Sequence, residues 1–139
     1  MFWPLMKDII TEKDKNEMVN FIQTSNRFTN GVKVKEFEEK WSNWLECKHS
    51  LFVSSGSTAN YLLLAAIKEL YGLKSGDKVL VPSMTWVTNI SPVTQLGLKP
   101  IFCDMDSYDF GFDKNHLNRI RMEHDDIKMI WITHLFGIA

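Results

Sequence analysis

The stretch that decides the fold runs from Ser50 to Asn60 and reads SLFVSSGSTAN. It passes from an apolar run, Leu51–Val53, which predicts a strand, through small hydroxylated residues around Gly56 and into a helix. The helix carries an apolar stripe from Thr58 to Tyr71 and is expected to end at Gly72. A strand-to-helix turn of this kind presents free backbone N–H groups at the positive helix end. The turn therefore predicts either a phosphate site or an ordinary helix cap.

Strands and helices continue to alternate after this turn. Lys78–Val81 predicts a second strand, and a helix follows from Trp86 to Leu96, which must kink or restart at Pro92. The remaining predicted elements are strands at Pro100–Cys103 and Met129–Thr133, with a short helix over Asn115–Arg121 between them. Helices of crossover length between strands imply parallel pairing. The expected fold class is therefore α/β, with a parallel-rich sheet flanked by helices.

The first third of the chain has a different pattern, and we expect residues 1–49 to form a helical segment ahead of an α/β part at 50–139. Thr11 is a suitable N-cap for a helix that ends near Thr24. A turn-rich break follows, and a second amphipathic helix then places Trp41 and Trp44 on its buried face.

Composition excludes several classes of protein. The 139 residues suit one domain, 45% are hydrophobic, and a net charge of −1 argues against a nucleic-acid partner. No apolar run reaches the ~18–20 residues that span a bilayer, and residues 1–8 lack a leader pattern, which favours a cytoplasmic protein. The two cysteines, Cys47 and Cys103, lack CxxC spacing and are expected to be buried free thiols. No histidine has a partner at metal-ligand spacing, so no metal site is predicted.

In parallel α/β sheets, ligands bind beyond the carboxyl ends of the strands, so the residues that follow each strand are the candidates. In the first turn, Gly56 permits close backbone approach, while Ser57 and Thr58 offer hydroxyls. In the second turn, Trp86 either stacks on a planar cofactor or packs as a core residue under the next helix.

Two further strand exits carry polar residues. Asp104 and Asp106 either bind a metal or hydroxyl groups, or form a solvated exit with helix-capping carboxylates. His134 either contacts a ligand or is a structural histidine.

Taken together and in order, five segments of this chain resemble the DegT/DnrJ-type sugar aminotransferase family, over about residues 28–139. The segments are Phe37-Glu38 with Trp41…Trp44-Leu45, Ser55–Asn60, Val81–Val87, Gly97–Asp106 and Thr133–Gly137. The resemblance implies the N-terminal portion of the large domain of the fold type I transferases, which use pyridoxal 5′-phosphate (PLP). It also implies an enzyme that moves an amino group from an amino acid to a nucleotide-linked keto-sugar in deoxyaminosugar or polysaccharide biosynthesis, acting as a homodimer.

The resemblance gives roles to single positions. Gly56 and Ser57 match the residues that bind the cofactor phosphate, with Thr58 beside them, and Trp86 matches the aromatic residue that stacks on the pyridine ring. Asn60, together with Asn89…Pro92, resembles a branch that includes sugar 3-dehydratases, which remove a hydroxyl group instead.

The family's Schiff-base Lys and pyridine-binding Asp lie downstream of the Thr133–Gly137 motif, and the dehydratase branch has His in place of that Lys. We therefore expect no catalytic residue within the chain, which is interpreted as an N-terminal fragment that is inactive alone. The alternative is a non-catalytic remnant that serves as a binding or assembly partner.

Overall fold

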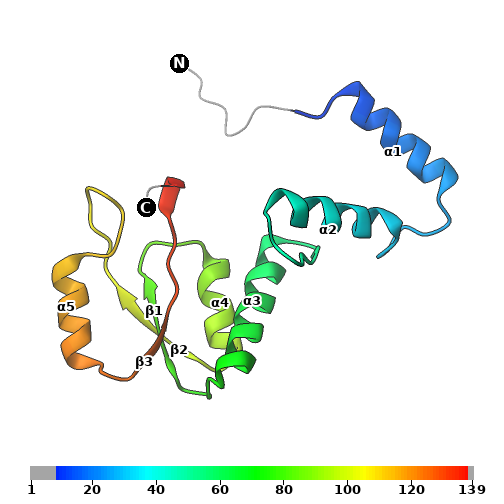
Figure 1. Ribbon diagram of the computed structural model, residues 1–139. Coiled ribbons are helices and arrows are strands. Elements are labelled where there is room, and N and C mark those ends of the chain that lie inside the picture. The colour runs from blue at the N-terminus through cyan, green and yellow to red at the C-terminus, as the bar shows by residue number, and fades with distance from the viewer. Residues whose placement is uncertain (1–8, 138–139) are drawn as a thin grey trace. The chain divides into compact units, whose positions relative to one another are not determined.

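The computed structural model describes residues 9–137 (Figure 1), so the prediction about a leader at residues 1–8 lies outside the described range. The chain divides into two compact units, Met1–Phe52 and Val53–Ala139. No helix within residues 9–137 is long and apolar enough to cross a membrane.

The first unit holds two helices, α1 (Glu12–Thr24) and α2 (Val32–Trp44), as predicted. Thr11 caps α1 in a reciprocal capping box with Asp14. The predicted burial of the α2 tryptophans is wrong, because Trp41 is 43% exposed and Trp44 is 71% exposed. Their rings pack along the helix instead, with centroids 5.0 Å apart.

The second unit contains a three-stranded parallel sheet in the order β2-β1-β3, which confirms the α/β class. Its strands are β1 (Lys78–Pro82), β2 (Lys99–Cys103) and β3 (Ile127–Ile130). The central residue Leu80 pairs with Ile101 on one side and with Ile130 on the other. Because β1 lies between two strands and two helical layers, its last four residues are all buried.

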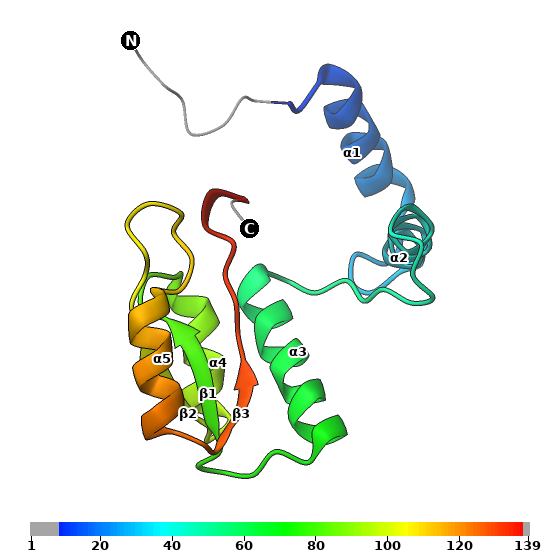
Figure 2. The ribbon, with the colours of Figure 1, turned by 60° about the vertical axis from the view of Figure 1, so that its left-hand side comes forward.

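Helices cover both faces of the sheet. They are α3 (Gly56–Tyr71), α4 (Val87–Gln95) and α5 (Lys114–Glu123), and a short 3-10 turn, η1 (Leu135–Gly137), follows β3. Val79 and Val81 pack toward Leu64 of α3, whereas Leu80 packs toward Ile120 of α5. Figures 1 and 2 show α3 and α4 together on one side of the sheet and α5 on the other. The alternation of side chains along β1 therefore builds two cores.

Two predicted strands need correction. Leu51–Val53 forms no strand in the structure, and Leu51 is 82% exposed. Its neighbour Phe52 donates its backbone N–H to the Glu38 carboxylate at 2.8 Å rather than to a strand. An apolar run becomes a strand only when another strand lies beside it. The last strand begins and ends earlier than predicted, at Ile127 and Ile130.

The cysteine prediction is correct for one residue only. Cys103 is buried at the end of β2, and burial raises the pKa of its thiol. Cys47 is exposed in the turn after α2, where its side chain lies 3.4 Å from the His49 carbonyl.

Pro92 lies inside α4 and is buried, and the helix neither ends nor restarts there. A proline has no N–H for the carbonyl four residues earlier, which here belongs to Thr88. The structure supplies a substitute donor, because Asn60 Nδ2 of α3 lies 3.3 Å from the Thr88 carbonyl oxygen. A side chain from the neighbouring helix therefore satisfies the backbone group that Pro92 leaves unpaired.

Candidate functional site

The strand order places a topological switch point between β1 and β3. The chain passes from β1 to β2 on one side and then crosses to the opposite side of β1 to form β3. Ligands of open α/β sheets bind at such a point, beyond the carboxyl ends of the strands. Here Thr85 follows β1 and Thr133 follows β3, and their hydroxyl oxygens are 2.8 Å apart. These two segments therefore meet where the topology predicts a site.

The α3 N-terminus presents the first group of candidate residues. Ser55 is the N-cap, and its hydroxyl accepts the Thr58 N–H while Thr58 Oγ1 accepts the Ser55 N–H at 3.0 Å. Within the described chain, the amides of Gly56 and Ser57 and the Ser57 hydroxyl have no hydrogen-bond partner. These three donors (the phosphate cup) lie at the positive end of a 16-residue helix.

Gly56 provides a test of whether an anion fits the phosphate cup. Its φ is not in the left-handed region, and an added Cβ would meet no atom within 4 Å. The protein's own packing and backbone therefore give no reason for glycine at this helical position, where Ala would be more favourable. A ligand that approaches the backbone closely would give one, as happens at other helix ends that bind phosphate. The donors and the open space both fit a phosphate group.

The Thr58 hydroxyl caps the helix and is not free to bind a ligand. Thr58 Oγ1 also donates to the Ser55 carbonyl at 2.8 Å, so both hydrogen-bonding functions of the hydroxyl serve the helix cap. Thr58 therefore shapes the turn that carries the phosphate cup, and its hydroxyl is used inside the protein.

Trp86 is the N-cap of α4, and its side chain is 72% exposed. The alternative prediction of a core tryptophan is therefore wrong. Its indole makes no ring contact with another aromatic side chain of the described residues. A large apolar ring beside the switch point is thus available to a planar ligand.

A polar network joins the three segments around this site. Asn60 of α3 donates to Asn89 Oδ1 at 2.6 Å, and Asn89 Nδ2 donates to Thr85 Oγ1 at 2.8 Å and to Thr133 Oγ1 at 3.1 Å. Sequence reasoning noticed Asn60 and Asn89 only as a family resemblance and missed Thr85 and Thr133. Thr85 follows one predicted strand and Thr133 is the last residue of another, and these positions were the available signal.

His134 lies in the same region. With Thr133, Asn60 and Asn89 it lines a groove of about 450 Å³ beside β3. The structure therefore brings His134 together with the network.

The strand-exit carboxylates lie in a loop of their own. Asp104 Oδ2 is 2.9 Å from His116 Nδ1, and Asp106 accepts the backbone N–H groups of Tyr108 and Asp109. These two backbone bonds hold the pKa of Asp106 below its ordinary value. The arrangement supports the loop interpretation of these residues, and Asp113 rather than either of them caps α5.

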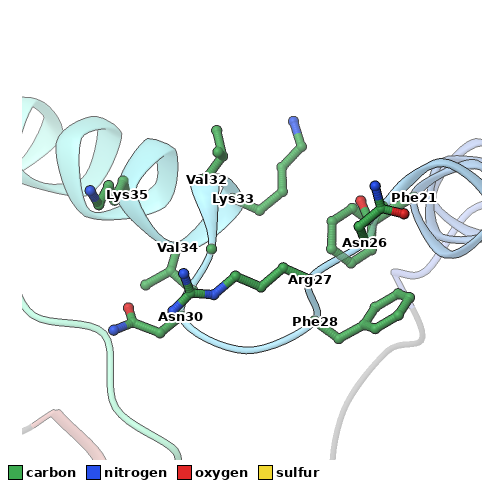
Figure 3. A pocket seen from close by; sticks show the side chains of 11 residues that line it. Phe21, Asn26, Arg27, Phe28, Asn30, Val32, Lys33, Val34 and Lys35 are labelled. Carbon is green, nitrogen blue, oxygen red and sulfur yellow. The ribbon is translucent and has the colours of Figure 1, made fainter.

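The first unit has a separate pocket at the turn between α1 and α2, of about 540 Å³. Arg27, Lys33 and Lys35 are among its lining residues, yet Figure 3 shows the two lysine side chains directed away from Arg27. Lys33 is also paired with Glu36 at 2.9 Å. The cations therefore do not converge on one ligand position.

Comparison with known proteins gives relatives of two kinds, sugar-nucleotide 3-dehydratases and sugar-nucleotide aminotransferases. The chain is 38% identical over 137 residues to a GDP-4-keto-6-deoxy-D-mannose 3-dehydratase of Yersinia pseudotuberculosis, covering 97% of this chain and 34% of the relative. It is 34% identical over 106 residues to a UDP-4-amino-4-deoxy-L-arabinose--oxoglutarate aminotransferase of Shewanella sediminis, covering 76% of this chain and 26% of the relative.

A solved structure has the same fold over most of this chain. A GDP-4-keto-6-deoxy-D-mannose-3-dehydratase of Escherichia coli with bound hydrated PLP superposes with a TM-score of 0.73 at 26% identity, covering 92% of this chain and 40% of that one. The chain thus spans about a third of the length of the curated relatives that it matches. The profile of the DegT/DnrJ/EryC1/StrS aminotransferase family matches residues 9–139, and the chain belongs to that family.

Proposed function

We propose that this chain supplies the phosphate cup and the ring-stacking surface of a PLP-dependent enzyme that aminates nucleotide-linked keto-sugars. The observation that carries the proposal is the unpaired set of donors at Gly56 and Ser57, together with the open space that a Cβ added at Gly56 would enter. The exposed Trp86 at the neighbouring turn supports it.

In this proposal the Gly56 and Ser57 amides and the Ser57 hydroxyl would donate hydrogen bonds to the cofactor phosphate. Trp86 covers one face of the pyridine ring and excludes water from it. When bound, PLP supplies an electron sink for chemistry at the carbon next to the amine. The described residues bind and orient the group, while the residue that moves the proton and the carboxylate that pairs with the ring nitrogen are proposed to lie in the remaining length that the relatives have.

The proposal extends to the whole protein. Residues 1–49 form a helical segment and residues 50–139 begin the PLP-binding domain of a cytoplasmic homodimer. An amino acid is the amino donor.

A 3-dehydratase that acts on a similar sugar nucleotide is the second candidate. The contact that favours it is the donation from Asn60 to the Thr88 carbonyl that Pro92 leaves free, because these residues carry the resemblance to the dehydratase branch. The relative matched over 97% of this chain is a 3-dehydratase as well.

Binding of pyridoxamine 5′-phosphate to the purified chain tests the shared part of both candidates. This amine form makes no imine with surface lysines, so titration calorimetry reports the site itself. We expect binding by the native chain, loss of binding in Ser57→Asp because a carboxylate repels the phosphate, and weak binding of pyridoxamine, which lacks the phosphate.

A matched control places the same charge elsewhere. Gln95 is exposed at the last position of α4, the end of that helix away from Trp86, so Gln95→Glu should bind like the native chain. Equal affinities in Ser57→Asp and Gln95→Glu would contradict the phosphate cup. Transaminase turnover by the 139-residue chain would contradict the placement of the proton-transfer residue outside it.

A further inference from the structure

We propose that Asn89 and Thr133 are positioning residues that hold Trp86 at a fixed place relative to the phosphate cup. The inference rests on the proposed function, because it concerns two surfaces that grip the same ligand. It assigns a role to side chains that belong neither to the phosphate cup nor to Trp86.

Asn89 holds the turn that carries Trp86. It is the third residue of α4, and its side chain reaches back across the helix N-terminus to the hydroxyl of Thr85, the residue before Trp86. Trp86 is an N-cap without an oxygen or nitrogen that could cap the helix. The amide of Asn89 therefore secures a turn that lacks an ordinary side-chain cap.

Asn60 connects the start of α4 to α3, the helix that carries the phosphate cup. It lies four residues after Gly56 in α3, on the same side of the helix and one turn further along. Its bond to Asn89 Oδ1 is 2.6 Å, and its second donor reaches the Thr88 carbonyl. At the far ends of the same two helices, Lys68 Nζ donates to the Leu96 carbonyl at 2.9 Å. This second contact lies at the ends of the helices away from the phosphate cup and Trp86 and is not part of the proposed network.

Thr133 fixes the third segment, which follows β3. Its hydroxyl accepts one Asn89 donor and pairs with Thr85, so a single oxygen joins the exits of β1 and β3. The two threonine hydroxyls share one hydrogen bond, which leaves one hydroxyl proton with no acceptor among residues 9–137. Both Asn89 donors need these two oxygens, and removing either oxygen leaves a donor unpaired.

The consequence is a preorganised spacing between two binding surfaces. A ligand held at its phosphate and at its ring gains affinity when the protein does not have to be ordered first. Inorganic phosphate uses the cup alone and should not depend on where Trp86 lies. Loss of the network should therefore weaken the binding of a ligand that has both a phosphate and a ring, and leave the binding of inorganic phosphate unchanged.

Thr133→Val and Thr133→Ser form the test, since Val keeps the shape and removes the hydroxyl while Ser keeps the hydroxyl. We expect Thr133→Val to bind pyridoxamine 5′-phosphate about three- to tenfold more weakly, the effect of one to two hydrogen bonds. Its affinity for inorganic phosphate, followed by the amide shifts of Gly56 and Ser57, should stay unchanged. Thr133→Ser should restore the native affinity. Lys68→Met, which cuts the contact between the far ends of the same helices, is the control and should bind both ligands like the native chain.

A spectroscopic signal reports the ring directly. Ligand-induced quenching of tryptophan emission that is lost in Trp86→Phe isolates the contact of Trp86 with the ring, and Thr133→Val should reduce it at saturation. Equal losses of both affinities, no change in Thr133→Val, or no rescue by Thr133→Ser would each overturn the positioning role. Absence of binding by the native chain would instead overturn the proposed function.

Discussion

Replacing Gly56 with Ala should stabilise the free chain and weaken its binding to the cofactor. The backbone at Gly56 is in a conformation that Ala adopts, and the new Cβ would meet no atom within 4 Å. Ala at such a position restricts the unfolded chain, which stabilises the folded state by about 0.5 kcal/mol. The same methyl group would occupy the space through which a phosphate reaches the backbone, so we expect an affinity about tenfold lower, or ~1.4 kcal/mol.

Gly72 at the other end of α3 is the matched control. An added Cβ also meets nothing within 4 Å there, but φ is +64°. Ala in this left-handed conformation costs about 1 kcal/mol. Gly56→Ala should therefore stabilise the folded chain, whereas Gly72→Ala should destabilise it. Only Gly56→Ala should change the affinity for the cofactor.

Urea unfolding followed by circular dichroism measures the first effect and calorimetry with pyridoxamine 5′-phosphate measures the second. With a slope of about 2 kcal/mol/M, the midpoint should rise by ~0.25 M in Gly56→Ala and fall by ~0.5 M in Gly72→Ala. A lower midpoint in Gly56→Ala would show that the protein itself needs this glycine. Native affinity in Gly56→Ala would show that no ligand approaches it.

Three other outcomes follow from burial and charge. Leu64→Ala should lower stability by about 2–5 kcal/mol in urea unfolding, because Leu64 is 0% exposed between α3 and the sheet. A thiol reagent should modify Cys47 in the folded chain and reach Cys103 only after unfolding; equal rates would contradict the burial of Cys103 and the rise in its thiol pKa that burial causes. The bond from Lys78 holds the pKa of Asp126 below 3.8. This stability is present above the ordinary pKa and is lost as pH falls through the lowered one, so Asp126→Asn should have a lower urea midpoint than the native chain at pH 7 and approach it near pH 3.

Local sequence signals predicted the helices and the central strand because the causes of these elements are local. The helix predicted from Thr58 is α3, which a box between Ser55 and Thr58 starts two residues earlier, at Gly56, and Gly72 ends it as predicted. The predicted apolar strand Lys78–Val81 is the buried central strand β1. Leu51–Val53 has similar apolar content and is not a strand, because a strand also needs a neighbour, which no short segment encodes.

The sequence by itself determined the α/β alternation, the family and the two turns that are proposed to bind the phosphate and the ring. Only the tertiary structure decided that Thr85 and Thr133 share a hydrogen bond across 48 positions, and that Asn60 supplies the donor that Pro92 removes from α4. The physical reason is that turns and caps arise from neighbouring residues, whereas the partner of a polar side chain depends on which strand exits the sheet order brings together.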